Sequence, residues 1–286
     1  MDTEPQSQSF AEASQGHYSR TMQPQPLLLD SITDADAAST GRIVISGSHG
    51  GIYPAAVASK WAVRAVMFND AGVGLENAGV AGVLELAKVG MASAAMDCQS
   101  CRIGSAADGV ARGQVSIANA IAAELGITSG MAVSTALERL AQAPEPQGQL
   151  APVDEARHQV MLESSSAAIW LLDSASLVKP EDEGETIITG SHGGLIGGDP
   201  SRALKAKAKI VVFNAAGVGI EGIGITRLPA LDKRGVAAVA VDCQTARIGD
   251  AASALDTGFI SHANQTAMNL AAAQGLALKA WLETCT

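Results

Sequence analysis

Histidine occurs twice in the same glycine-rich setting, and histidine is the side chain that most often moves protons at neutral pH. A Gly-Ser-His-Gly-Gly segment at 47–51 is centred on His49, and the same five residues recur at 190–194 around His192. Because glycines permit positive φ and let backbone N–H groups point at a ligand, each segment is predicted to cradle an anion or oxyanion. A tight turn around a structurally bonded histidine is the alternative. The predicted substrate contacts in these segments are Ser48, Gly50, Gly51, Ser191, Gly193 and Gly194.

Cysteine also occurs twice in one setting. Asp-Cys-Gln stands at 97–99 and 242–244, and Arg-Ile-Gly follows both copies. A nearby positive charge can hold a thiol as the reactive thiolate, so Cys98 and Cys243 are predicted as nucleophiles or bases. Arg102 and Arg247 are predicted to hold a substrate carboxylate through two parallel hydrogen bonds. Inert buried thiols, and arginines paired with the aspartate before each cysteine, remain open alternatives.

A third repeated motif, Phe-Asn-x-Ala-Gly-Val-Gly, fills 68–74 and 213–219. Its asparagines, Asn69 and Asn214, are expected either to fix the loop or to donate to substrate. Asp70 is a catalytic candidate in the first copy, where the second has Ala215, so the two halves could play unlike roles. The Gly-x-Gly portion has no third glycine, which argues against a nicotinamide cofactor. We expect neither a cofactor nor a metal, since no typical metal-ligand spacing occurs.

The spacing of these motifs predicts an internal duplication. Subtracting 49 from 192 gives 143, and subtracting 69 from 214 or 97 from 242 gives 145. The expected organisation is a flexible arm at 1–26, one repeat at 27–140, a linker rich in Pro and Gln at 141–160, and a second repeat at 161–286.

Short apolar runs alternate with helical patterns in both halves, which is typical of α/β folds with parallel sheets. The expected fold is two homologous Rossmann-like lobes, each a mostly parallel sheet flanked by helices, related by a pseudo-two-fold axis. All the repeated motifs follow apolar runs, which places them at the carboxyl ends of strands, where such sheets bind ligands. The expected strands are 27–29, 42–46, 64–68, 91–96, 169–172, 186–189, 209–213 and 236–241, and the expected helices are 54–61, 77–88, 105–125, 200–207, 225–233 and 250–274.

Composition narrows the possible partners. A net charge of −10 lacks the basic surface that nucleic acid or an anionic membrane requires. Four cysteines in 286 residues make no disulfide framework, and the N-terminus lacks a signal-peptide pattern, so a cytoplasmic setting is expected. We expect a small, anionic substrate and a homo-oligomer.

The motifs favour a metal-independent hydrolase of a small amide, cyclic amide or ester bearing a carboxylate. In this hypothesis a cysteine attacks, a histidine transfers protons, the glycine turn stabilises the oxyanion and an arginine holds the carboxylate. One alternative is a racemase, isomerase or lyase with two facing thiols, an arrangement similar, at the level of the fold, to the two-cysteine amino-acid racemases. Another is a protein that binds an anionic metabolite without catalysis.

Overall fold

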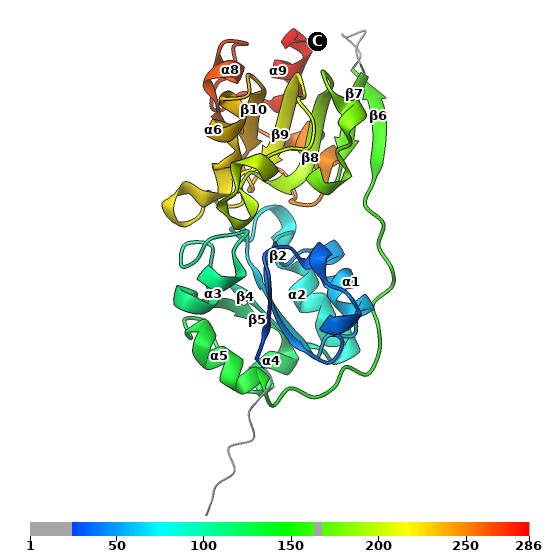
Figure 1. The fold of residues 1–286 in the computed structure, drawn as a ribbon, viewed down its shortest axis with the longest axis vertical. Helices are drawn as coiled ribbons and strands as arrows, with labels where there is room; N and C mark the ends of the chain where they lie inside the picture. The colour runs from blue at the N-terminus through cyan, green and yellow to red at the C-terminus, as the bar shows by residue number, and fades with distance from the viewer. Residues whose placement is uncertain (1–24, 163–167, 286) are drawn as a thin grey trace, which may run out of the picture.

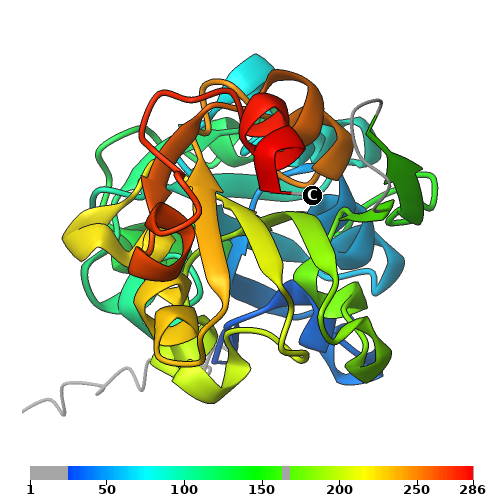
Figure 2. The same ribbon diagram turned by 90° about the horizontal axis from the view of Figure 1, so that it is seen from above.

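Two lobes, stacked one above the other, make up the described part of the chain (Figure 1). The structure is a computed structural model that describes residues 25–162 and 168–285. The predicted arm at 1–26 therefore lies, apart from its last two residues, outside the described residues. Seen from above, the C-terminal lobe covers the N-terminal one (Figure 2).

The N-terminal lobe has a five-stranded sheet with the order β1-β2-β3-β4-β5. β1 to β4 run parallel, and β5 pairs antiparallel with β4. Its strands are β1 (Leu27–Leu29), β2 (Ile43–His49), β3 (Ala65–Asn69), β4 (Ala92–Met96) and β5 (Val115–Ala118). Its helices are α1 (Ile52–Lys60), α2 (Ala81–Glu85), α3 (Ala106–Arg112), α4 (Ala120–Glu124) and α5 (Val133–Leu140), with 3₁₀ turns at Ile32–Asp34, Ala37–Ser39, Leu75–Asn77 and Leu86–Val89.

The C-terminal lobe has a six-stranded sheet with the order β11-β10-β9-β8-β7-β6. β7 to β10 run parallel, whereas both edge strands are antiparallel to their neighbours. Its strands are β6 (Arg157–Met161), β7 (Ala168–Leu172), β8 (Thr186–His192), β9 (Ile210–Asn214), β10 (Ala237–Val241) and β11 (Ile260–Ala263). Its helices are α6 (Arg227–Asp232), α7 (Ala251–Thr257), α8 (Gln265–Met268) and α9 (Leu278–Cys285), with 3₁₀ turns at Ala175–Leu177, Pro180–Asp182, Ile196–Gly198, Pro200–Arg202 and Ile220–Ile225.

Apolar side chains fill both faces of each sheet. In the N-terminal lobe, α1 and α2 contribute to the core on one face, and α3, α4 and α5 contribute to the core on the other. In the C-terminal lobe, α6 packs on one face and α7, α8 and α9 on the other. Every residue of β3, β4, β9 and β10 is buried, as expected for parallel strands covered on both sides. The prediction of an α/β fold with mostly parallel sheets and flanking helices is confirmed.

The long closing helices predicted at 105–125 and 250–274 are wrong. Each is replaced by a short helix, an antiparallel edge strand and another short helix. Gly113 ends α3 in extended backbone, with φ −62° and ψ 150°, and the β-branched residues Val115 and Ile117 then pair with β4. Gly258 ends α7 in the same way before β11. His262, expected on a helix, therefore lies on β11.

Two further helices are shorter than predicted. The helix expected at 77–88 begins only at Ala81, because Glu76 and Asn77 have positive φ. The helix expected at 200–207 is reduced to one 3₁₀ turn. Within the described ranges, no helix combines the length and apolar character needed to cross a membrane.

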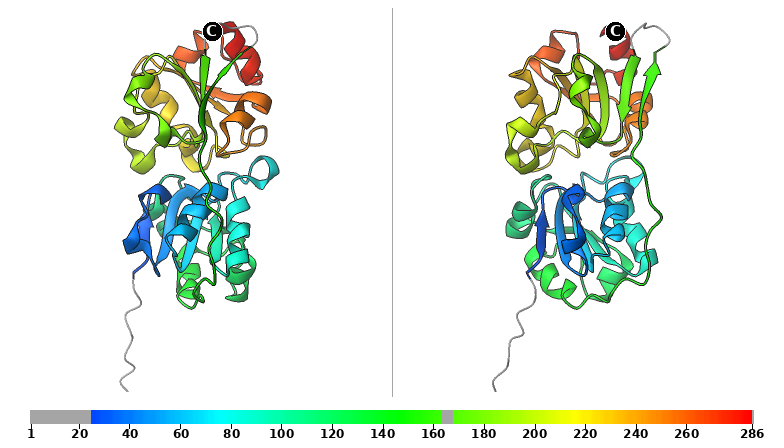
Figure 3. Two further views of the ribbon diagram at one scale, coloured as in Figure 1. Left: turned by 90° about the vertical axis from the view of Figure 1, so that its right-hand side faces the viewer. Right: turned by 45° about the vertical axis from the view of Figure 1, so that its right-hand side comes forward.

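The segment that joins α5 to β6, coloured green, runs along one side of both lobes (Figure 1, Figure 3). It contains most of the stretch predicted as a linker at 141–160. Because it passes both lobes, its polar side chains can reach the space between them.

Candidate functional site

The histidine loops leave the sheets at the carboxyl ends of neighbouring strands. β2 ends on His49, which pairs in register with Asn69 at the end of β3. β8 ends on His192, paired with Asn214 at the end of β9. In both sheets the pairing shifts just before the histidine. Such irregularities re-aim side chains, and here both imidazoles face the space between the lobes.

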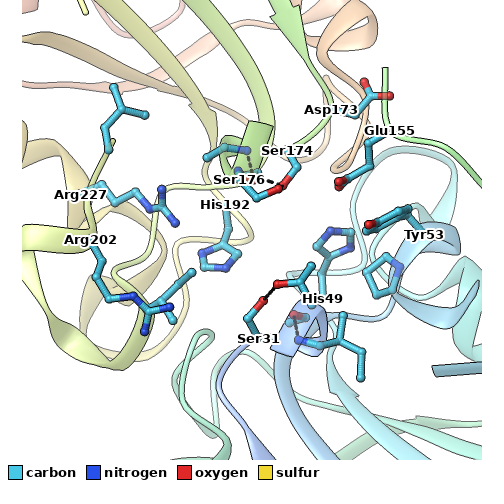
Figure 4. A pocket seen from close by; sticks show the side chains of 18 of the residues that line it. Ser31, His49, Tyr53, Glu155, Asp173, Ser174, Ser176, His192, Arg202 and Arg227 are labelled. Atoms are coloured by element: carbon cyan, nitrogen blue, oxygen red, sulfur yellow. Dashed lines mark hydrogen bonds between the residues drawn. The ribbon is translucent and has the colours of Figure 1, made fainter. Parts of the chain in front are cut away.

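Both imidazoles line one cavity of about 350 Å³ (Figure 4), here called the histidine cavity. Arg202 and Arg227 lie on one side of it, beyond His192. Tyr53, Glu155 and Asp173 lie on the other side, beyond His49. A volume of this size suits a small molecule, and the separated charges give it a cationic and an acidic end.

The two imidazole rings make the same hydrogen bond, each within its own loop. The Gly51 N–H donates to Nδ1 of His49 at 3.2 Å, and the Gly194 N–H donates to Nδ1 of His192 at the same distance. Since Nδ1 accepts, the proton of a neutral ring is on Nε2. Burial lowers the pKa of His49 to about 4. Burial, followed by Arg227 and His49, also lowers the pKa of His192 well below its ordinary value. At pH 7 both rings are therefore neutral donors.

The glycines of these loops do not form the predicted anion cradle. None of Gly50, Gly51, Gly193 and Gly194 has positive φ. Their amides are used internally: the first of each pair donates to the carbonyl of the asparagine that ends the next strand, and the second donates to the histidine. A larger residue would clash at these positions. A Cβ on Gly51, for example, would lie 2.7 Å from Nδ1 of His49. The histidine rings, rather than the loop amides, are therefore the groups of these loops that are available in the cavity.

The neighbouring serines and asparagines hold the loops in place. Ser48 Oγ accepts the Ile32 N–H at 3.0 Å, and Ser191 Oγ accepts the Ala175 N–H at 2.9 Å. Both serines nevertheless line the histidine cavity. Asn69 and Asn214 are buried, and their side chains bond to backbone groups of adjacent loops. Of the two roles that the sequence left open for the asparagines, the structure places them in loop fixation.

Glu155 is a cavity residue that the sequence did not single out. It comes from the segment that joins the lobes, and burial raises its pKa to about 7, although hydrogen bonds with Tyr53 and Ser174 oppose the rise. The carboxyl group is thus poised to exchange a proton near neutral pH. It occurs once, outside the repeated motifs, so the repetition of motifs gave no signal for it.

Asp173 was also missed, although the sequence does carry a signal for it. Leu-Leu-Asp-Ser stands at 28–31 and again at 171–174, with the 143-residue offset of the histidines. The Asp173 carboxylate accepts the N–H groups of Ala251 and Ala156. It therefore ties α7 and the joining segment to the edge of the cavity.

Arg202 and Arg227 differ in whether their guanidinium groups are free to bind a ligand. The buried Arg227 donates to the carbonyls of Gly194 and Ala203, both at 2.9 Å, and so supports the His192 loop. No hydrogen bond or ion pair within residues 25–162 and 168–285 uses the Arg202 guanidinium, which lines the cavity. Lys205 also lines the cavity, and its Nζ donates to the Ser176 carbonyl. An anionic group would find its partner here.

The predicted cysteines and Asp70 lie elsewhere. Cys98, Cys243 and Asp70 line a more open cleft of about 570 Å³, here called the cysteine cleft. It shares no lining residue with the histidine cavity. The structure therefore brings the two histidines together and the two cysteines together, but not the histidines with the cysteines.

The thiols are not held as thiolates. Burial, followed by the charge of Asp70, raises the pKa of Cys98 to about 12. Burial also raises the pKa of Cys243. Arg102 and Arg247 were predicted to lower these pKa values and so to stabilise the thiolates, but neither arginine contributes to the pKa of Cys98 or Cys243.

The two arginines instead link the lobes. Nε of Arg102 donates to Glu221 at 3.0 Å, and Arg247 donates to Glu76 at 3.1 Å, each across the lobe boundary. Arg102 also pairs with Asp108. The arginines pair with carboxylates other than the aspartates beside the cysteines, so both guanidinium groups already have carboxylate partners within the chain.

One cluster in the cysteine cleft could hold a metal ion. Ligand atoms of Asp70, Asp97 and Cys98 all lie within 4.8 Å of one another.

No family model matches the chain, and neither the curated proteins nor the solved structures with which it was compared include a match.

Proposed function

We propose that the chain is an enzyme that hydrolyses a small amide, cyclic amide or ester bearing an anionic group, with the histidine cavity as its active site. The observation that carries the proposal is the convergence on one cavity of two neutral imidazole donors, one from each lobe, beside a carboxyl group whose pKa is about 7.

In the proposed reaction Glu155 is the base. Its carboxylate takes a proton from a water molecule, and the water oxygen attacks the substrate carbonyl carbon. The resulting oxyanion accepts hydrogen bonds from Nε2–H of His49 and of His192. Protonated Glu155 then gives its proton to the leaving nitrogen or oxygen, which restores the carboxylate. Arg202 binds the anionic group at the far end.

This assignment moves the reacting group from the cysteines to Glu155 and water. The hypothesis of cysteine attack assisted by histidine requires both side chains at one carbonyl, and they line separate spaces. The two-thiol isomerase is supported only by the shared cleft. Against it, the thiol pKa values are raised, and a Cβ on Gly217 would lie 3.0 Å from the Cys98 sulfur, so backbone crowds the space beside that thiol.

The same cavity favours one other reaction class. A base with a pKa near 7 and two neutral N–H donors could also remove a proton next to a carbonyl and stabilise the enolate. Incorporation of solvent deuterium into a substrate that is not cleaved would identify this class.

We also propose that the two lobes are duplicated Rossmann-like units related by a pseudo-two-fold axis. Reciprocal contacts support this: the Leu75 N–H donates to the Cys243 carbonyl at 2.7 Å, and the Ile220 N–H donates to the Cys98 carbonyl at 2.8 Å. Contacts of the form i to j and j to i are those of a two-fold interface. A cytoplasmic homo-oligomer remains a prediction from the sequence.

The test is turnover of a panel of small amides, cyclic amides and esters, with and without a carboxylate. Glu155→Gln should lower kcat by about 10²–10⁴-fold, whereas Glu145→Gln, on the same segment but exposed, should leave it unchanged. Arg202→Gln should raise KM only for substrates with the carboxylate. Full activity in Glu155→Gln would refute the mechanism. Ligand binding without any turnover would instead indicate a binding protein.

A further inference from the structure

A second cavity, of about 270 Å³, meets the histidine cavity at the side chains of the proposed reaction. Four residues line both spaces: His49, Tyr53, Glu155 and Asp173. The second space, here called the adjoining cavity, lies at the acidic end of the histidine cavity. The reaction described above assigns nothing to it.

Apolar side chains form much of the wall of the adjoining cavity. Ile52, on the first turn of α1, and Val153, on the segment that joins the lobes, are 42% and 37% exposed. Both line the cavity together with Ala78, Ala81 and Ile248. Exposed aliphatic side chains from separate parts of the chain, gathered around one cavity, favour an apolar group as its occupant.

The charged side chains of the adjoining cavity disfavour an anion. Arg247 is the only arginine or lysine among the described residues that line it, and its guanidinium already pairs with Glu76 at 3.1 Å and Asp250 at 2.9 Å. Asp154 and Asp173 also line the cavity, and no ion pair in the described part of the chain includes either. A negatively charged group would be repelled by these carboxylates, so the occupant is neutral or cationic.

The proposed reaction determines which part of the substrate lies here. Arg202, which holds the anionic group, lies beyond His192, whereas Glu155 lies on the opposite side, beyond His49 (Figure 4). Protonated Glu155 gives its proton to the leaving atom, so that atom must lie within hydrogen-bond reach of the carboxyl group. The leaving group therefore extends from Glu155 away from Arg202, and the adjoining cavity is the space that lies against Glu155 on this side.

We propose that the adjoining cavity binds the leaving group of the substrate, and that this group is an apolar amine or alcohol without a negative charge. The inference rests on the proposed function and narrows it to open-chain amides and esters, because a cyclic amide does not release its nitrogen as a separate molecule. The water oxygen bonds to the carbonyl carbon, the bond from that carbon to nitrogen or oxygen breaks, and the proton held by Glu155 goes to the released atom.

The experiment measures the affinity of a series of N-alkyl succinamic acids, from methyl to hexyl, by calorimetry. Each probe has a carboxylate at one end and the amide of an alkylamine at the other. Glu155→Gln is titrated, because it is expected to bind the probes without cleaving them. Each added CH₂ should lower Kd by about fourfold until the cavity is full. A probe with carboxymethyl in place of propyl should bind about tenfold more weakly than the propyl probe.

Three substitutions, each made in the Glu155→Gln background, locate the effect. Ile52→Asp should abolish the gain with chain length, because it places a charge on the apolar wall, and an acidic residue suits the first turn of a helix. Val153→Asp should do the same without altering a helix. Leu276→Asp is the control, since Leu276 is 41% exposed and lines neither cavity, and it should keep the full gain.

Absence of binding, equal affinities across the series, or tighter binding of the carboxymethyl probe than of the propyl probe would overturn the proposal. So would a full gain in both Ile52→Asp and Val153→Asp. Cleavage of the probes by the unmodified chain without any effect of chain length refutes only the role of the adjoining cavity. Affinity that rises with chain length, without cleavage of any amide or ester, refutes the proposed function instead.

Discussion

A single carboxyl group, Glu155, decides how the histidine cavity responds to pH. In the proposed reaction it acts as a base only when ionised, and burial raises its pKa to about 7. We expect kcat/KM to rise with pH up to about 7 and then to level off. The histidines should not contribute to this profile, since the pKa of His49 is about 4. A profile that is flat between pH 5 and 8 would contradict the assignment.

The same carboxyl group should lower stability at high pH. Its folded pKa of about 7 exceeds the ordinary value of 4.5, so the folded chain holds this proton more tightly than the unfolded chain does. The stability associated with the protonated group is complete below about 4.5 and is lost as pH rises through 7. Glu155→Gln should therefore melt at a higher temperature than the unmodified chain at pH 8, and the difference should shrink toward pH 4.5. Glu145→Gln is the control.

The Nδ1 bond of His49 offers a second test at the residue scale. In Gly51→Ala the new Cβ would lie 2.7 Å from Nδ1, so the ring must move. Misplacement of a reacting group by about 1 Å can cost about 10²-fold in rate. Gly148→Ala is the matched control, because its Cβ would meet nothing closer than 3.7 Å. Equal kcat values for the two variants would show that the ring position is unimportant.

At the scale of elements, the sequence predicted the parallel strands well and the closing helices poorly. Continuous apolar runs flanked by glycine identify buried strands, and β3, β4, β9 and β10 follow them. The closing segments are rich in alanine, which favours helix in any short window. Besides the glycines that end α3 and α7, a tertiary interaction interrupts each predicted helix. An asparagine in each segment bonds to the backbone of a strand that is distant in the sequence.

These asparagines are Asn119 and Asn264, and their contacts correspond one to one. Oδ1 of Asn264 accepts the N–H groups of Ala238 and Ala267, and Nδ2 donates to the carbonyls of Leu228 and Val236. Asn119 makes the same four kinds of bond in the N-terminal lobe. Each side chain thus caps a helix and closes the sheet edge.

Asn264→Ala and Asn119→Ala should each destabilise the chain by about 3 kcal/mol, because each leaves several buried groups unsatisfied. Asn269→Ala, at an exposed position in the same region, should change stability by less than about 0.5 kcal/mol. Urea denaturation measures all three. Similar losses for the two buried asparagines would also agree with equivalent roles in the two lobes.

At the scale of the whole molecule, the candidate site exists because the lobes meet in one orientation, and motif spacing could not supply that orientation. The histidines and cysteines of the repeated motifs were expected in one cleft. The contact of two loops instead leaves them in separate spaces. In each loop four consecutive residues have positive φ: Ala71 to Gly74 in one lobe, and Ala216 to Gly219 in the other. Such a run is strained for non-glycine residues, and sequence patterns do not signal it.

A close contact of the lobes, between Gly72 and Gly217, tests whether this loop contact positions the histidine cavity. A Cβ on Gly72 would lie 2.7 Å from the Gly217 Cα, so Gly72→Ala must push the lobes apart. Gly235 also has positive φ, but a Cβ there meets nothing within 4 Å, so Gly235→Ala isolates the backbone strain, about 1–2 kcal/mol. Gly72→Ala should cost more by about 1–3 kcal/mol and should also reduce turnover, because His49 and His192 come from different lobes. Gly217→Ala should match it, since the crowding is mutual. If Gly72→Ala behaved like Gly235→Ala in both stability and turnover, the lobe contact would not be what aligns the two imidazoles.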